Sequence, residues 1–122
     1  MKDRIIYMYA AYDCLQSIGE YIQGYDLELF LQDKKTQDAV IRNFEVLGQT
    51  IKDFGIEDLQ LDFPRIQWSQ IAGMRNIIAH EYLGVDKVII WETAINHLEP
   101  IKIVIEQVLA PHKRASGRVI ND

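Results

Sequence analysis

The segment from Arg75 to Tyr82, which reads RNIIAHEY, holds the side chains of this sequence best suited to chemistry. Arg75 offers a planar fork of donors that matches a phosphate group. His80 can accept or donate a proton near neutral pH, and Asn76 can orient that imidazole or hydrogen-bond a phosphate oxygen. These residues suit metal-independent RNA cleavage. His80 would serve as base on the 2′-hydroxyl or acid at the leaving oxygen, while Arg75 would stabilise the pentacoordinate state.

A helix over residues 67–82 would divide these side chains between two faces, at about 100° per residue. The predicted core face consists of Ile71, Met74, Ile77 and Ile78. The other face consists of Ala72, Arg75, Asn76, Ala79 and Tyr82, with His80 near its edge. Asn76 and His80 are four residues apart, so their side chains are predicted to be neighbours. The negative end of the helix dipole would favour a protonated His80.

Small residues interrupt the second face and predict the close approach of another backbone or of a ligand. They are Ala72, Gly73 and Ala79. Glycine in the middle of a helix costs about 1 kcal/mol relative to alanine, so Gly73 indicates tight packing. A second interpretation stays open, because the same Arg, Asn, His and Tyr side chains could form a buried polar network that fixes a helix crossing. An arginine and a histidine five residues apart do not by themselves decide between the two interpretations.

The composition describes one globular domain that can bury a core without disulfides or metals. The chain has 122 residues, of which 48% are hydrophobic and 25% charged. Its only cysteine, Cys14, is expected to be a buried apolar residue of the first helix. The three histidines lack the ligand spacing of a metal site, and no cofactor is predicted. A net charge of −5 argues against a general nucleic-acid coat, so an RNA site would need a local cluster of cations.

The expected location is the cytoplasm, without membrane attachment. The first residues show no secretory signal, and no apolar run approaches the roughly 20 residues that would span a bilayer. One helical domain is predicted over residues 1–110. Residues 111–122 are predicted to form a basic, flexible tail.

Apolar residues recur three or four positions apart through most of the chain, which predicts amphipathic helices. The first helix spans about residues 2–23, with a core stripe of Ile5, Met8, Tyr12, Leu15, Ile18 and Ile22. The second spans about residues 34–54 and ends at Gly55, with a core stripe of Val40, Phe44, Leu47 and Ile51. Residues 27–31 are a short helix or a packed turn, and residues 56–63 are predicted to be a loop.

The third helix is predicted to begin at or shortly after Pro64 and to reach about Tyr82. A fourth runs from an Asp86 cap to about Leu109. Its core stripe contains Val88, Trp91, Ile95, Leu98, Ile101 or Lys102, and Ile105. Pro100 predicts a kink or break in it, and Pro111 is predicted to end it. No segment shows clean strand alternation. The predicted fold is therefore all-α, an antiparallel bundle of four to five helices.

The stretch from Gly73 to Tyr82 resembles the Arg-x4-His-x-Tyr signature of HepT-like toxins, a branch of the HEPN (higher eukaryote and prokaryote nucleotide-binding) superfamily. The resemblance extends over nearly the whole chain. Residues 30–39 resemble the stretch before the family's second helix, and residues 42–48 resemble that helix. The most specific matches are Ile71-Ala72-Gly73-Met74 and the His80-Glu81-Tyr82 ending.

This resemblance implies a HEPN-like homodimer in which two Arg-x4-His motifs form a composite ribonuclease site. Arg75, Asn76 and His80 would be its catalytic residues, and cellular RNA, such as tRNA or mRNA, its substrate. It also implies a type VII-like toxin–antitoxin pair with a minimal nucleotidyltransferase (MntA-like) antitoxin, which transfers AMP to Tyr82. A bulky negative group there would repel RNA. The other interpretation of Tyr82 is a core aromatic residue at a helix end.

The sequence departs from the family pattern at two positions. Gln49 stands where relatives commonly have an acidic residue, which leaves open whether the second helix assists Arg75 with a carboxylate. Gln67 precedes Trp68 where relatives often have proline, which only shifts the helix start. His97 is interpreted as an ordinary helix residue and His112 as part of the tail. The competing functions are a non-catalytic helical partner of a nucleotidyltransferase and a purely structural dimer.

Overall fold

The computed structural model describes residues 4–81 and 84–116, without the side chains of residues 77, 79–81 and 113–116. Every regular element in this part of the chain is helical, which confirms the all-α prediction. The helices are α1 (Ile5–Ile22), α2 (Leu27–Gln32), α3 (Lys34–Phe54), α4 (Ile56–Asp62), α5 (Trp68–Glu81), α6 (Lys87–Asn96) and α7 (Leu98–Ser116). None of these helices is long and apolar enough to cross a membrane.

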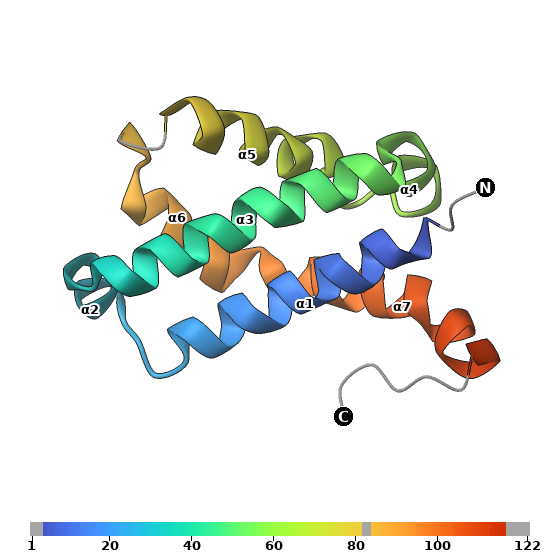
Figure 1. Ribbon diagram of the computed structural model, residues 1–122, viewed down its shortest axis with the longest axis horizontal. Coiled ribbons are helices and arrows are strands. Elements are labelled where there is room, and N and C mark those ends of the chain that lie inside the picture. Colours follow the sequence, from blue (N-terminus) through green and yellow to red (C-terminus); the bar gives the residue numbers. More distant parts are fainter. Residues whose placement is uncertain (1–3, 82–83, 117–122) are drawn as a thin grey trace.

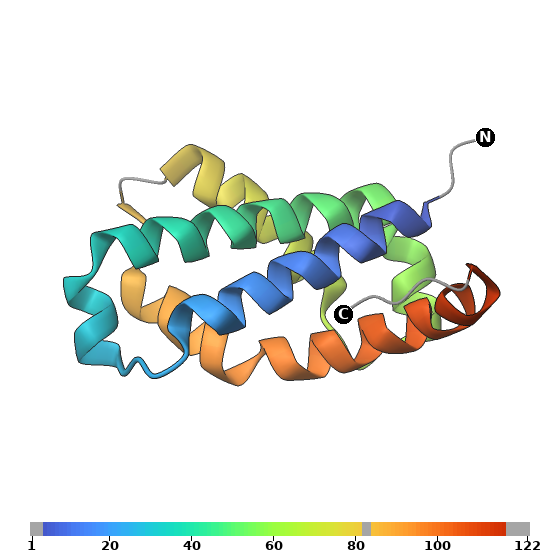
Figure 2. The ribbon, with the colours of Figure 1, turned by 60° about the horizontal axis from the view of Figure 1, so that its bottom comes forward.

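The long helices form an antiparallel bundle in which α3 is central. Figure 1 shows α1, α3 and α5 side by side, with α3 running opposite to both neighbours. Viewed after the turn in Figure 2, α7 runs along α1 on the side of α1 away from α5. The short helix α2 packs on α3 and α6, and α4 packs on α5. Helix α5, which carries Arg75 and Asn76, is thus an outer helix that packs mainly on α3.

The apolar stripes predicted for the first two long helices form the core. Met8, Tyr12, Leu15 and Ile18 of α1 are buried, and so are Val40, Phe44, Leu47 and Ile51 of α3. Each such side chain contributes about 1.5–3 kcal/mol when it is fully removed from water. Cys14 is buried as expected, and burial raises the pKa of its thiol to about 11. The thiol therefore stays protonated at neutral pH and acts as a small apolar group.

The acidic stretch after α3 is helix α4, so the predicted loop over residues 56–63 is wrong. Gly55 ends α3 with a φ of 127°, a conformation that favours glycine, and α4 begins at the next residue. Glu57 and Asp58 lie in the first turn of α4, where the helix dipole stabilises acidic side chains. Arg4 stabilises the junction between α3 and α4, because its guanidinium donates to the Phe54 carbonyl at 2.8 Å and to Asp58 at 2.7 Å.

The break predicted at Pro100 lies at His97, between α6 and α7. Pro100 is the third residue of α7, where its missing N–H has no partner within the helix. The break also changes which side chains are buried. Ile90, Trp91 and Ala94 form the core stripe of α6, whereas Val88 and Ile95 are 36% and 52% exposed, contrary to the prediction. The Asp86 cap is confirmed, because its carboxylate accepts from the Val88 and Ile89 amides.

Pro111 does not end the last helix, so that prediction is wrong. α7 continues through Pro111 to Ser116. An internal proline removes one helical hydrogen bond, but the turn before it is anchored by Leu109, which is fully buried. The predicted boundary at residue 110 therefore falls inside α7. Residues 117–122 of the predicted tail lie outside the described residues.

Candidate active site on helix α5

Helix α5 is anchored at its first residue. The Trp68 side chain is fully buried, and its indole nitrogen donates to the Phe63 carbonyl at 3.0 Å. The Gln67 carbonyl accepts from the Gln70 and Ile71 amides, which closes the first turn. The helix therefore starts four residues after Pro64, in agreement with the predicted start shortly after it. This anchor fixes where each later side chain of α5 lies.

The middle of α5 crosses α3 at Gly48, which is buried. A methyl group on Gly48 would lie 2.9 Å from the Ile71 carbonyl oxygen, 3.2 Å from the Ala72 carbonyl oxygen and 3.1 Å from the Arg75 Cβ. No side chain fits at that separation, so only glycine allows the two helices to approach this closely. The base of the Arg75 side chain is thereby held against α3.

This crossing corrects the predicted division of α5 into two faces. Ile71 and Ile78 are buried as predicted, and Met74 is half-buried against the core. Ala72 was predicted on the outward face but is only 7% exposed, because it packs toward α3. Gly73 was expected to mark tight packing, yet a methyl group there would meet no atom within 4 Å. The close approach within this chain is at Gly48 instead.

Sequence reasoning missed Gly48, although a signal was present. A glycine inside the predicted helix over residues 34–54 carries the same cost of about 1 kcal/mol that drew attention to Gly73. Its spacing from Phe44 and Ile51 places it next to the core stripe rather than on the solvent side. A glycine beside a core stripe predicts helix–helix contact more strongly than one on an outward face.

Arg75 and Asn76 form a hydrogen-bonded pair of donor side chains at the surface of α5. Arg75 is half-buried and Asn76 is exposed. The Arg75 guanidinium donates to Asn76 Oδ1 at 3.2 Å, which leaves the amide nitrogen of Asn76 directed elsewhere as a donor. The pair therefore presents N–H groups from two side chains, one of them cationic. Such an arrangement suits an anion with several oxygens, such as a phosphate.

The other predicted site residues lie at the end of the same helix. The His80 backbone belongs to the last turn of α5, but its side chain lies outside the described residues, as do the side chain of Ala79 and all of Tyr82. The Asn76–His80 adjacency thus remains a prediction from spacing. Gln49, on the α3 turn that crosses α5, donates to Asp53 at 2.9 Å, so this amide is engaged along its own helix.

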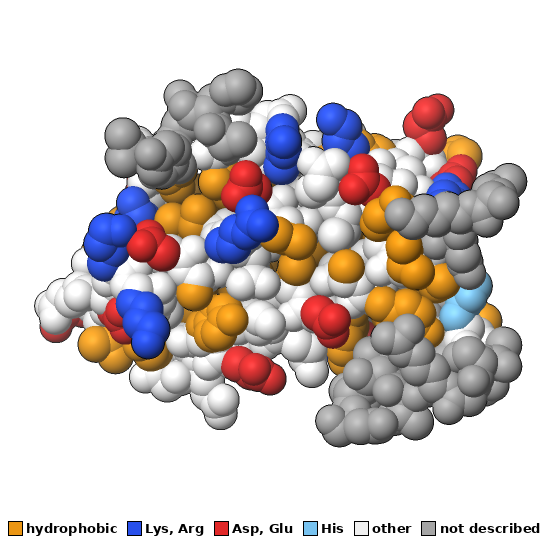
Figure 3. All heavy atoms as spheres, viewed as in Figure 1, with side chains coloured by type: hydrophobic (Ala, Val, Ile, Leu, Met, Phe, Trp, Pro, Cys, Tyr) orange, Lys and Arg blue, Asp and Glu red, His pale blue; other side chains and the backbone are white. Residues whose placement is uncertain are grey.

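Charges of both signs are interspersed around this region. Figure 3 shows lysine, arginine and acidic side chains alternating over the α3 side of the molecule. Within the described residues, no group of three His, Cys, Asp or Glu side chains is arranged to hold a metal ion. Among the described side chains, Arg75 and Asn76 supply the donors of the candidate site.

Comparison with known proteins identifies relatives over most of the chain. Residues 11–108 match the family described as "Ribonuclease HepT-like". A protein of Thermococcus cleftensis named "Probable ribonuclease HepT" is 34% identical over 96 residues, covering 79% of this chain and 86% of that protein. A protein of Methanocaldococcus jannaschii named "Putative RNase" is 32% identical over 108 residues, covering 88% of each chain. No solved structure matches the chain.

Proposed function

Because the chain belongs to the HepT-like ribonuclease family, we propose that it is a metal-independent endoribonuclease toxin acting on cellular RNA in the cytoplasm. The observation that carries this proposal is the Arg75–Asn76 donor pair at the surface of α5, with His80 in the last turn of the same helix. The pair supplies charge stabilisation for a phosphate. The histidine supplies a group that can transfer protons at neutral pH.

The proposed reaction begins when a neutral His80 imidazole removes the proton from a ribose 2′-hydroxyl. The 2′-oxygen attacks the adjacent phosphorus, and Arg75 and Asn76 donate to the oxygens that gain charge. The bond from phosphorus to the 5′-oxygen then breaks, and a protonated imidazole gives its proton to that oxygen. The products are a 2′,3′-cyclic phosphate and a free 5′-hydroxyl. No water or metal is consumed in this transfer.

The reaction uses one proton acceptor and one proton donor, and the motif of each chain supplies a single histidine. We therefore place the active unit in a homodimer in which each chain contributes Arg75 and His80. A hollow of about 700 Å³ supports this arrangement, since it is mainly apolar and opens beside Gly73 and Met74 between α5, α6 and α7. Ile89, which also lines it, is 58% exposed. A second copy would cover this surface.

In this proposal Tyr82, which follows α5 directly in the sequence, regulates the dimer's activity. We propose that an MntA-like nucleotidyltransferase antitoxin transfers AMP from ATP to the Tyr82 phenol oxygen and releases pyrophosphate. The added phosphate would place a negative charge seven residues along the chain from Arg75 and would repel RNA. Mass spectrometry of the peptide containing Tyr82, after co-expression with the antitoxin, should show added AMP. An unmodified Tyr82 in an inhibited toxin would contradict this switch.

The proposed activity is tested with purified protein, total RNA and EDTA. We expect the wild type to cleave RNA and to leave cyclic phosphate ends. His80→Ala should cleave at least about 100-fold more slowly, because general acid–base catalysis contributes that much or more. If wild type and His80→Ala are equally inactive after any AMP has been removed, the enzyme proposal fails. A tight complex with a nucleotidyltransferase would then favour a non-catalytic partner.

A further inference from the structure

A second hollow, of about 750 Å³, lies on the α3 side of α5. Its lining comes from four helices: α2, the first half of α3, Ile78 of α5 and Lys87 of α6. Ile78 is three residues beyond Arg75, so the two residues are neighbours on the helix and about 4.5 Å apart along its axis. The hollow therefore lies about one turn of α5 beyond Arg75, which does not itself line it.

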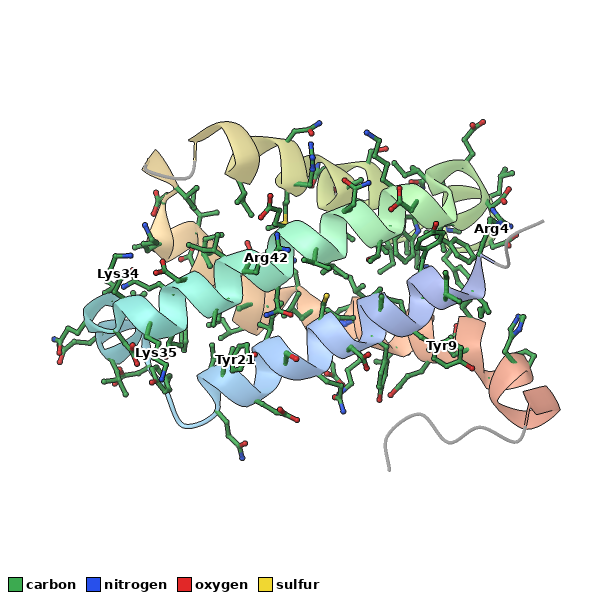
Figure 4. All side chains as sticks on the ribbon, viewed as in Figure 1. Arg4, Tyr9, Tyr21, Lys34, Lys35 and Arg42 are labelled. Atoms are coloured by element: carbon green, nitrogen blue, oxygen red, sulfur yellow. The ribbon has the colours of Figure 1, made fainter. Side chains whose placement is uncertain are left out.

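Three cations line this hollow, although the chain as a whole has a net charge of −5. They are Lys34 and Arg42 of α3 and Lys87 of α6. Figure 4 shows Lys34 in the first turn of α3 and Arg42 further along the same helix. Arg42 is exposed and Lys87 is half-buried. Together with Arg75 they provide cationic groups along one edge of α3 and α5.

Two acidic residues, Asp38 and Glu45, also line the hollow, so its charged side chains sum to one positive charge. Lys34 pairs with Asp38 at 2.9 Å and Arg42 with Glu45 at 3.3 Å, and three of these four side chains are well exposed to water. Exposed pairs of this kind contribute little and exchange readily for another anion. Lys87 donates to the Val85 carbonyl. The amides at the starts of α3 and α6 are already capped by Asp33 and Asp86, so an anion would be held by side chains.

The uncharged part of the lining combines the amides of Gln32 and Gln37 with an apolar surface that suits a nucleobase or ribose. Leu31, Ile41 and Ile78 contribute this surface. A volume of several hundred cubic ångströms is typical of a pocket for a small organic group. Proteins that bind single-stranded nucleic acid combine cations that contact the phosphates with side chains on which the bases pack, most often aromatic ones. In this hollow the packing surface is aliphatic.

We propose that this hollow is an RNA subsite, which receives a nucleotide next to the cleaved phosphate while Arg42 and Lys87 contact its backbone. This inference rests on the proposed ribonuclease function and adds the path of the substrate. RNA that leaves Arg75 on the α3 side would pass directly over the hollow. Lys35 follows Lys34 in α3 and is exposed but does not line the hollow, so it provides a matched control.

The test measures binding of a fluorescein-labelled single-stranded RNA to full-length His80→Ala protein by anisotropy, over a range of salt concentrations. Adding Lys87→Ala or Arg42→Ala should each weaken binding about 3- to 10-fold and reduce the salt dependence by about 0.7 in log–log slope. Adding Lys35→Ala should change neither quantity. Circular dichroism should show equal helix content in all variants, since none of these side chains lies in the core.

Several results would overturn the subsite. They are equal losses in all three variants, no loss in Lys87→Ala and Arg42→Ala, or no RNA binding by the parent protein. If Lys87→Ala binds RNA normally but loses the nucleotidyltransferase, the hollow belongs to that protein instead. Failure of the ribonuclease proposal gives a different pattern of results. Wild-type protein would then cleave no RNA, but Lys87→Ala would still weaken RNA binding. Normal cleavage with unchanged binding in the variants would refute only the subsite.

Discussion

Replacing Arg75 with alanine should lower the rate of RNA cleavage about 100- to 1000-fold, as expected when a donor to the transition-state charge is removed. The substitution removes the guanidinium that donates to Asn76. It keeps the Cβ that lies against α3 at Gly48, so the helix crossing should persist. The rate of single-turnover cleavage and the melting temperature, measured on the same preparations, separate a loss of chemistry from a loss of folding.

Arg75→Lys tests whether the reaction needs the planar guanidinium of Arg75 or only its positive charge. Lysine keeps the positive charge but loses the planar fork, so it should recover only part of the lost rate. Lys35→Ala removes an exposed cation away from the site and should cleave as fast as the wild type. Wild-type cleavage by Arg75→Ala would refute the assigned role. A melting temperature low enough to explain the slower rate would make Arg75 a structural residue.

Gly48→Ala should lower the free energy of unfolding by up to about 2 kcal/mol, although alanine is the better helix former. The added methyl would lie within 3.2 Å of two α5 carbonyl oxygens and the Arg75 Cβ. Overpacking costs about 1–3 kcal/mol, offset by about 1 kcal/mol of helix propensity. Because α5 must shift, Arg75 moves with it, and cleavage should fall about 10-fold or more even where the protein is folded.

Gly19→Ala is the matched control, since Gly19 lies in α1 and a methyl there would meet no atom within 4 Å. The same chemical change should therefore raise the free energy of unfolding by about 0.5–1 kcal/mol and leave cleavage unchanged. Urea unfolding of the two variants beside the wild type measures the difference. Equal stabilisation by both substitutions would show that the α3–α5 contact at Gly48 is not tight.

Local sequence patterns predicted most of the fold, because long amphipathic helices depend on periodicity and on their end signals. The stripes of α1 and α3, the Asp86 cap and the end of α3 at Gly55 were all recognisable in this way. The errors fell where two local signals compete. The acidic residues of α4 indicated a loop, yet Glu57 and Asp58 favour the first turn of a helix. Pro111 indicated an end, yet packing carries α7 onward.

The sequence predicted which residue types α5 carries but not how this helix packs. The spacing placed Arg75 and Asn76 together, and the structure adds the hydrogen bond between them. Periodicity could not tell which side of α5 faces α3, because that depends on a residue far away in sequence, Gly48. The position of Ala72 was wrong for this reason. The cations of the second hollow come from α3 and α6, so only the folded chain brings them beside α5.

The most direct test of the composite site measures cleavage in mixtures of wild-type and His80→Ala chains that have been allowed to exchange. The total wild-type concentration is held constant while the inactive chain is added. If both histidines of a dimer are needed, mixed dimers are slow, and an equal mixture should lower the rate per wild-type chain to about half. A rate per wild-type chain that stays constant at every ratio would contradict the composite site and place the activity in a single chain.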